Sequence, residues 1–297
     1  MKYLVIGGTG SFGQYYVRHL LKNGEQVRVF SRDEFKQHYM RKEFPQVEYV
    51  VGDVRDYEAV RSAMRGVCRV VHAAALKHVR TGEEFPQEAI KTNVGGTENV
   101  VNAAASRHIE QLVFLSTDKA CGPVNTYGST KMLAERLVMQ AEYNAVRYGN
   151  VMGSRGSVLH IFNEIERGGV FPITDQRMTR FAVTLEYAAE LVDIAFTYPP
   201  GYMVVGKPPA FRIVDLVDAF HPGARIVETG VQAGEKLHEM LLTEYEAARA
   251  TDEGNHFLLR QDEGGQLPCD LKAFTSGDGP FMSVEKIREM IKEVTGE

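Results

Sequence analysis

The feature that most constrains the fold of this chain is a glycine-rich turn directly after a short apolar run at the amino end. Tyr3 to Ile6 has the composition of a buried strand, GGTGSFG follows, and helical periodicity runs from Phe12 to Lys22. Gly7, Gly10 and Gly13 would let the backbone approach a pyrophosphate, and the N–H groups at the start of the helix would bind it. The strand, the turn and the helix together predict a dinucleotide site in a doubly wound sheet.

Short apolar runs alternate with longer amphipathic stretches through the first half of the chain, which is typical of a parallel sheet covered by helices. A helix is predicted over Gln87 to Ser106, with Pro86 in its opening turn, where proline is tolerated. Further strands are predicted at Gln26 to Ser31, Val47 to Val51, Arg69 to Ala74, Gln111 to Ser116, Ala145 to Tyr148 and Tyr202 to Val205.

The composition changes after about Val151, where loops and short helices carry scattered arginines. We therefore predict an α/β fold of the Rossmann type. Its doubly wound parallel sheet is expected in residues 1–152, with a strand and a helix that return to it at about 182–206. Residues 153–297 are expected to form mainly a smaller substrate-binding region, in which Ser283 caps a last amphipathic helix.

The charge and the cysteine content exclude several classes of protein. The formal net charge is −5 and no block of Lys and Arg occurs, so a nucleic-acid partner is not expected. Cys68, Cys121 and Cys269 have no CxxC spacing and are odd in number, which predicts neither a metal site nor a disulfide framework. The first apolar run is too short for a signal peptide, and no later run reaches the ~18 residues of a membrane helix. We expect a cytoplasmic protein without a membrane partner.

The end of the second predicted strand indicates which dinucleotide binds. An NAD-specific protein usually has an acidic residue there, whereas this chain has Ser31 and Arg32, which suit the 2′-phosphate of NADP. Lys36 offers a second cation, although a solvated surface lysine is an equally good interpretation. Asp53 follows the third strand, where it either meets the adenine edge or caps the next helix, and the sequence weighs equally for both.

The segment STDKACGPVNTYGSTK carries the strongest indication of chemistry. Tyr127 and Lys131 are four residues apart, so both side chains lie on one face of a helix. The ammonium group is expected to lower the pKa of the phenol, so that Tyr127 accepts the proton of a sugar hydroxyl as hydride leaves for nicotinamide, while Lys131 holds the ribose. Asn93 in TNVGGT either holds a water or a main-chain carbonyl near Lys131, or is satisfied by local hydrogen bonds.

These segments, with SRDE, GDVRD, AALKHV, VRYGNVMGSRGSV, MTRF and GEKLHE, resemble the extended short-chain dehydrogenase/reductases from Met1 to about Thr251. Within that superfamily the chain resembles the inverting UDP-N-acetylglucosamine 4,6-dehydratases of polysaccharide and pseudaminic-acid biosynthesis. The resemblance implies that Lys119 removes the carbon-5 proton and Asp118 assists loss of the 6-hydroxyl, since retaining dehydratases have Asp-Glu at this pair. A lysine base needs a depressed pKa, which burial beside another cation such as Lys77 would provide.

The resemblance further implies an NADP-dependent lyase that acts on UDP-N-acetylglucosamine, inverts carbon 5 and forms homo-oligomers. There are two alternatives: a UDP-sugar epimerase of the same fold, which needs no base at carbon 5, and a non-catalytic NADP-binding regulatory or scaffold protein. The chain has fewer residues than the family near Tyr143 to Ala145, which predicts a tight connection from helix to strand.

The predicted site residues fall into three sets. Catalytic roles are expected for Thr117, Asp118, Lys119, Tyr127 and Lys131. Cofactor contacts are expected from Gly7, Thr9, Gly10, Ser11, Phe12, Gly13, Ser31, Arg32, Lys36, Asp53, Val54, Ala73, Ala74, Ala75, Lys77, Asn93, Ser116, Tyr127, Lys131 and Tyr148. Substrate contacts are expected from Lys77, Asn150, Arg155, Thr179, Arg180, Lys207 and Glu235. Arg180 is the first choice for a phosphate, because a guanidinium binds phosphate oxygens in pairs.

Overall fold

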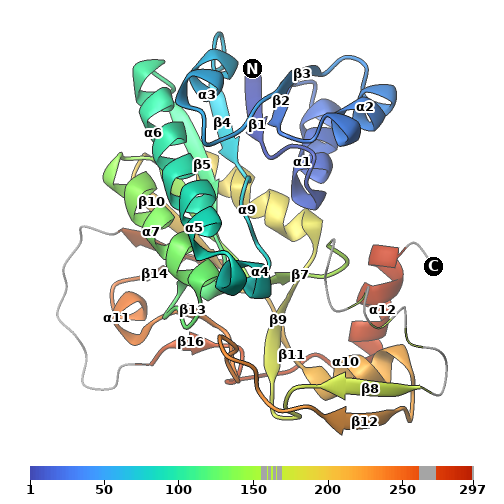
Figure 1. The fold of residues 1–297 in the computed structure, drawn as a ribbon. Coiled ribbons are helices and arrows are strands. Elements are labelled where there is room, and N and C mark those ends of the chain that lie inside the picture. Colours follow the sequence, from blue (N-terminus) through green and yellow to red (C-terminus); the bar gives the residue numbers. More distant parts are fainter. Residues whose placement is uncertain (155–158, 160–161, 163–164, 166–168, 261–271, 296–297) are drawn as a thin grey trace.

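A nine-stranded sheet forms the framework of the protein (Figure 1). The computed structural model describes residues 1–154, 159, 162, 165, 169–260 and 272–295. The strand order is β14-β15-β10-β6-β5-β4-β1-β2-β3. Neighbouring strands are parallel from β10 to β3, whereas β15 is antiparallel to β10 and to β14. The strand bounds are β1 Lys2–Ile6, β2 Gln26–Ser31, β3 Glu48–Val51, β4 Arg69–His72, β5 Gln111–Leu115, β6 Asn144–Arg147, β10 Tyr202–Gly206, β14 Thr251–Asp252 and β15 His256–Arg260.

The central strands are buried on both faces. In β1, Leu4 and Ile6 belong to one apolar core and Tyr3 and Val5 to another, because successive side chains of a strand point to opposite faces. Helices α3 (Tyr57–Ala63), α6 (Gly96–Ser106) and α7 (Thr126–Gln140) contribute to the first core, and α1 (Ser11–Lys22), α2 (Glu34–Glu43) and α9 (Leu185–Thr197) to the second. The predicted doubly wound parallel sheet of the Rossmann type is thereby confirmed.

The predicted strands are confirmed with shifts of at most two residues at their ends. The predicted helix over residues 87–106 is less regular than expected: α5 (Pro86–Ala89) leads into a π-helix (Ile90–Gly95) and then into α6. Pro86 does occupy the first turn of α5. The antiparallel edge formed by β14 and β15 was not predicted. Within the described part of the chain, no helix combines the length and the apolar character that crossing a membrane requires.

A second group of elements lies below the large sheet in Figure 1. It has its own apolar core, which includes Phe162, Phe171, Phe211, Leu216 and Ile287. As predicted, Ser283 caps the last helix, since its Oγ accepts from Lys286 N at 3.3 Å. The remaining elements are β7 Asn150–Val151, β8 Val170–Ile173, β9 Thr179–Val183, β11 Ala210–Arg212, β12 Arg225–Glu228, β13 Met240–Leu242, β16 Phe274–Thr275, α4 Val79–Glu84, α10 Ile213–Phe220, α11 Glu244–Ala247 and α12 Val284–Thr295, with a 3-10 turn at Asp118–Ala120.

A buried ion cluster joins α7, β6 and α11. Arg147 at the end of β6 donates to both carboxylate oxygens of Glu135, at 3.0 and 2.7 Å, and to both of Glu246, at 3.0 and 3.1 Å. It also donates to Leu241 O at 2.9 Å. The Arg147 side chain is 2% exposed. This guanidinium therefore ties the carboxyl-terminal segment to the layer of helices on the large sheet.

Candidate active site

A cavity of about 870 Å³ lies at the carboxyl ends of β1, β4 and β5, where doubly wound sheets bind their ligands. Its volume falls in the usual range for small-molecule sites. All five predicted catalytic residues line it. The other predicted residues that line it are Gly7, Gly10, Ser11, Phe12, Gly13, Lys36, Ala73, Ala75, Lys77, Ser116, Tyr148, Asn150, Arg180 and Glu235.

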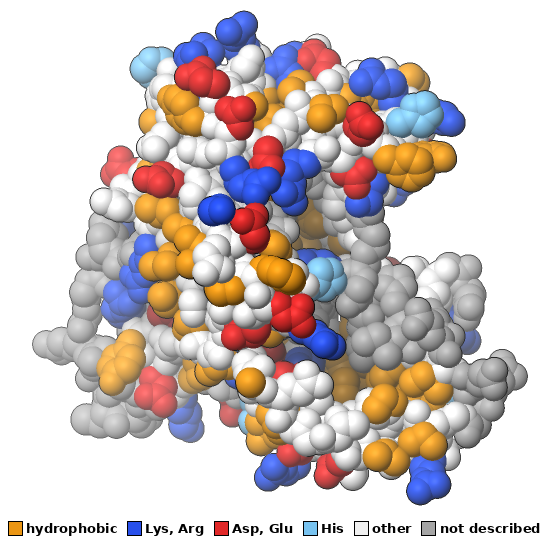
Figure 2. Space-filling model, in the orientation of Figure 1, with side chains coloured by type: hydrophobic (Ala, Val, Ile, Leu, Met, Phe, Trp, Pro, Cys, Tyr) orange, Lys and Arg blue, Asp and Glu red, His pale blue; other side chains and the backbone are white. Residues whose placement is uncertain are grey.

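Some of the predicted site residues are not in the lining of this cavity. Those that the structure describes are Thr9, Ser31, Arg32, Asp53, Val54, Ala74, Asn93, Thr179 and Lys207. Arg155 lies outside the described residues. On the face shown in Figure 2, Lys and Arg side chains lie among Asp and Glu side chains.

The glycine turn has the geometry of a nucleotide cradle. Gly7 has φ +83°, and a Cβ there would come within 2.7 Å of Ala74 N. A Cβ on Gly13 would lie 2.5 Å from Gly7 O. Gly10 precedes α1, and no side chain caps the N–H groups of its first turn. The turn therefore leaves backbone donors at the cavity, and the residues present fit a dinucleotide.

The residues proposed for a 2′-phosphate lie around the end of β2. Ser31 Oγ accepts from the buried Gln37 Nε2 at 2.9 Å, which leaves its own hydroxyl proton to donate. Arg32 is exposed, and its Nη1 lies 3.6 Å from an oxygen of Asp53. Lys36 lines the cavity and pairs with Asp33.

Asp53 does not cap a helix, which removes one of its two interpretations. Its carboxylate accepts from Arg55 Nε at 3.0 Å and from Arg55 Nη2 at 2.6 Å, and α3 is capped by Asp56, whose Oδ1 accepts from Ala59 N at 3.1 Å. Val54 is buried, and its carbonyl accepts from Asn99 Nδ2 at 3.1 Å. These hydrogen bonds fix the loop that contains Asp53 and Val54.

Asn93 holds the loop after β4 rather than a local turn. Its Oδ1 accepts from Leu76 N at 2.8 Å, and its Nδ2 donates to Leu76 O at 3.0 Å and to Thr130 Oγ1 at 3.0 Å. The side chain sits in the π-helix and is buried. The structure thus supports a main-chain carbonyl, that of Leu76, as the partner of Asn93, and the second partner, Thr130, directly precedes Lys131 in the sequence.

Tyr127 and Lys131 are both buried on α7. Lys131 Nζ donates to Leu115 O at 2.5 Å and lies 3.8 Å from the centre of the Phe114 ring. Burial lowers the pKa of Lys131 to about 7. Burial also raises the pKa of Tyr127 to about 12, against smaller lowering effects of Lys119 and Thr117. The expectation that Lys131 lowers the pKa of the phenol was therefore wrong for this structure, since desolvation outweighs the nearby charge.

A second group of charged side chains lies close to Tyr127. A Cβ on Gly128 would lie 2.1 Å from Lys119 O, so only glycine lets α7 approach the Asp118–Ala120 turn this closely. Lys119 Nζ lies 3.0 Å from Asp118 Oδ1 and 3.1 Å from Glu239 Oε1. Glu239 was not among the predicted site residues, although GEKLHE contains it, because the acidic residue predicted from that segment was Glu235.

These charges shift one another's pKa values. Burial and the negative charge of Glu239 raise the pKa of Asp118, against the opposite effect of Lys119. Burial alone would lower the pKa of Lys119, but the carboxylates of Asp118 and Glu239 outweigh it and raise the pKa. The expected depressed pKa of Lys119 was therefore wrong for the free protein. Burial would raise the pKa of Glu239, but Lys119 and Arg180 lower it.

The substrate side of the cavity comes from the second group of elements. Arg180 on β9 is fixed by Nη1, which donates to Thr179 O at 2.7 Å and Leu237 O at 3.2 Å. Glu235 and Asn150 line the cavity as well. Thr179 is buried, and its Oγ1 bonds to Ser276 Oγ at 2.7 Å and His238 Nδ1 at 2.8 Å, so it supports the neighbouring strand.

Lys207 is turned away from this group. Its Nζ pairs with Asp252 on β14, donates to Gly254 O at 3.1 Å and lies 4.0 Å from the centre of the Phe257 ring. The structure therefore does not bring Lys207 together with the other predicted substrate residues. The reason is the antiparallel edge of the sheet, whose strands supply its partners.

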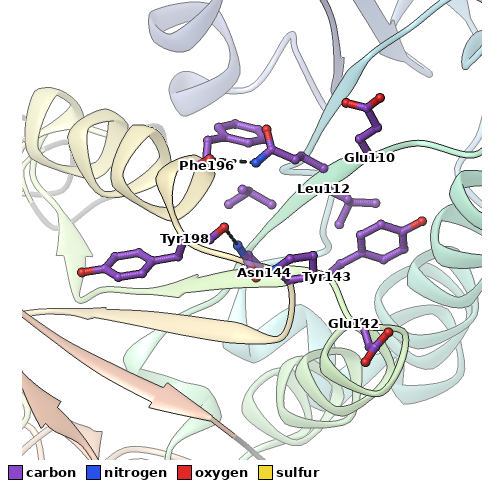
Figure 3. A pocket seen from close by; sticks show the side chains of 10 residues that line it. Glu110, Leu112, Glu142, Tyr143, Asn144, Phe196 and Tyr198 are labelled. Atoms are coloured by element: carbon purple, nitrogen blue, oxygen red, sulfur yellow. Dashed lines mark hydrogen bonds between the residues drawn. The ribbon is translucent and has the colours of Figure 1, made fainter.

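A second, small pocket lies beside Leu112 and Asn144, at the amino ends of β5 and β6 (Figure 3). Asn144 Nδ2 donates across it to Ala195 O at 2.8 Å and Tyr198 O at 3.3 Å. Helix α7 ends at Gln140 and β6 begins at Asn144, which confirms the predicted tight connection. The pocket volume of about 10 Å³ is that of one water molecule, too small for a sugar nucleotide.

Comparisons with known proteins agree with this geometry. A model of the polysaccharide biosynthesis protein family matches residues 3–261. The inverting UDP-N-acetylglucosamine 4,6-dehydratase of Campylobacter jejuni is 38% identical, over 99% of this chain and 98% of that protein. The UDP-glucose 4-epimerase of Rickettsia bellii is 39% identical, over 97% and 94%. The X-ray structure of Pen from Bacillus thuringiensis superposes with a TM-score of 0.92 at 34% identity, over 99% and 97%.

Proposed function

This chain belongs to the polysaccharide biosynthesis protein family, and from that premise we propose that it is an NADP-dependent lyase that removes water from UDP-N-acetylglucosamine. The product is a UDP-2-acetamido-2,6-dideoxy-4-keto-hexose inverted at carbon 5. The inverting dehydratase from Campylobacter jejuni supports this proposal. Since an epimerase is about equally similar, the choice between the two reactions depends on the residues of the site.

The single observation that carries the proposal is the convergence of Tyr127 with Asp118 and Lys119 in one cavity. Oxidation and return of hydride at carbon 4 need only one proton acceptor at the 4-hydroxyl. Elimination needs two further groups, a base at carbon 5 and an acid at the leaving 6-hydroxyl. Asp118 and Lys119 supply such groups. Burial raises the pKa of Asp118, which favours the protonated carboxyl group that can donate to the leaving hydroxyl.

Each residue has a defined part in this reaction. Tyr127, as a phenolate, takes the proton of the 4-hydroxyl as hydride leaves carbon 4, and the resulting ketone acidifies the carbon-5 hydrogen. Lys119 removes that hydrogen as a proton, and Asp118 gives its own proton to the departing 6-hydroxyl, so that water leaves. Lys131 and the glycine turn would hold the cofactor, which would supply a hydride acceptor at carbon 4 and a hydride donor at carbon 6, and carbon 5 would then take back a proton. Arg180 binds a phosphate of the UDP group.

Turnover in heavy water tests the proposed function. UDP-N-acetylglucosamine should lose one water and gain deuterium at carbon 5, because Lys119 exchanges its proton with solvent before carbon 5 is protonated again. Mass spectrometry and NMR of the sugar measure both changes. An unchanged sugar mass with a new configuration at carbon 4 would identify an epimerase, and an unchanged sugar would identify a binding protein.

Cofactor choice is a separate prediction. Arg32→Ala should raise the Kd for NADP by about 10- to 100-fold, because a charge-assisted hydrogen bond to the 2′-phosphate contributes roughly 1.5–3 kcal/mol. The Kd for NAD should stay within about twofold. Titration calorimetry measures both constants. Lys42→Ala, at the other end of α2, is the control and should change neither; an equal loss for both cofactors in Arg32→Ala would contradict the assignment.

A further inference from the structure

We propose that Glu239 is a positioning residue for the elimination step: it holds the Lys119 ammonium group in place and accepts its proton when Lys119 becomes a base. The inference rests on the proposed function, since it concerns the group assigned to carbon 5. Glu239 Oε1 lies 3.1 Å from Lys119 Nζ, at hydrogen-bonding distance. A proton can therefore move between the two groups without any rearrangement of the chain.

Glu239 is held in place by hydrogen bonds to its backbone, and its side chain is exposed to almost no solvent. Its N–H donates to Ser276 Oγ at 2.9 Å, and its carbonyl accepts from Ser276 N at 2.8 Å. The side chain is 4% exposed. Among the described residues, Glu239 Oε2 has no hydrogen-bond partner. A buried carboxylate oxygen without a partner is costly, and protonation of the carboxyl group would reduce that cost.

The charge balance of the cluster identifies Glu239 as the acceptor. Lys119 can act as a base only after it has lost its proton, and the two carboxyl groups beside it are the nearest acceptors. Burial and the charge of Glu239 raise the pKa of Asp118, so Asp118 more readily keeps its own proton and leaves Glu239 to accept the proton of Lys119. Transfer breaks one Nζ–H bond and forms one Oε–H bond, and it turns two buried charges into two neutral groups. The lone pair on Nζ is then free to take the carbon-5 proton.

Two further cations face Glu239. Arg180 Nε lies 3.8 Å from Glu239 Oε1, and Lys236, whose Nζ donates to Cys121 O at 2.6 Å, also favours the ionised carboxylate. Arg180 lines the cavity. A substrate phosphate on Arg180 would offset part of that positive charge and make Glu239 a better proton acceptor. The base would thus form when the substrate is bound.

Glu239→Gln tests the inference, because glutamine keeps the size and the hydrogen bond but cannot accept the proton. Exchange at carbon 5 and loss of water should fall by about 10²-fold, while reduced nicotinamide should form in a single turnover within about threefold of the wild-type rate. The residual rate should rise about tenfold per pH unit between about pH 7 and 9, where the wild-type rate is nearly flat, since Lys119 must then lose its proton to solvent. Glu239→Asp should restore part of the rate.

Glu235→Gln is the matched control on the same segment, and it should change the KM for the UDP-sugar without changing the pH dependence. If Glu239→Gln lost water at the wild-type rate and with the wild-type pH dependence, the inference would be overturned but the proposed function would stand. An equal loss of oxidation and elimination in Glu239→Gln would have the same consequence. A wild-type protein that loses no water from the substrate would overturn the proposed function together with the inference. If Glu239→Gln does not fold, Glu239→Asp decides: elimination must slow by about tenfold and hydride transfer must not.

Discussion

Replacing Tyr127 with Phe is expected to lower the rate of hydride transfer by at least about 10³-fold. The phenol oxygen is the group assigned to take the proton of the 4-hydroxyl, and without an acceptor the carbon–oxygen double bond cannot form. Phenylalanine keeps the ring, which is buried on α7, so the packing changes little. The measurement is the absorbance of reduced nicotinamide during a single turnover with UDP-N-acetylglucosamine.

Lys119→Met is the matched comparison, since it removes a different group from the same cavity. Reduced nicotinamide should still form, at a rate within about tenfold of wild type, because burial dominates the pKa of Tyr127 and Lys119 only moderates it. Loss of water should stall. Normal turnover in Lys119→Met would refute the base assignment, and wild-type formation of reduced nicotinamide in Tyr127→Phe would refute the role of the tyrosine.

The parts of the site that are local in sequence could be predicted from the sequence. Gly7 lies in the turn and Gly13 in the first turn of the helix that follows it, and Tyr127 and Lys131 lie on one helix face, so spacing alone places them. The parallel sheet could also be predicted, because strands buried on both faces, such as β1, are apolar over most of their length. These features depend on periodicity and turn geometry, which a single segment carries.

The electrostatics of the site could not be predicted in this way. Glu239 reaches Lys119 from 120 positions further along the chain, through a segment fixed by Ser276. The neighbouring Asp118 raises the pKa of Lys119, and Glu239 adds to that effect from a distant segment. The separation of Lys207 from the other predicted substrate residues was not predicted for a similar reason, since its partner Asp252 lies on an edge strand with weak sequence signals. Such contacts depend on tertiary packing between distant segments.

The ion cluster around Arg147 is the feature on which stability should depend most. Its guanidinium satisfies two carboxylates, Glu135 and Glu246, in a place that excludes water. Burial would raise the pKa of Glu246, but Arg147 outweighs it and lowers the pKa from its ordinary 4.5 to about 2. Ser116 also donates to Glu135, so the cluster lies next to the segment that carries Asp118 and Lys119.

Arg147→Met should lower the free energy of unfolding by about 3–5 kcal/mol, because it leaves two carboxylates buried without a cation. Urea denaturation at pH 7 measures the change. Arg177→Met is the control: Arg177 pairs with Asp175 but is 76% exposed, so its loss should leave the free energy of unfolding nearly unchanged. The folded pKa of Glu246 is depressed, so its contribution is present above pH 4.5 and is lost as the pH falls toward 2. The difference in the free energy of unfolding between wild type and Arg147→Met should therefore narrow as the pH falls from 4.5 toward 2. A loss below about 1 kcal/mol at pH 7 would show that the cluster contributes no more than a surface ion pair.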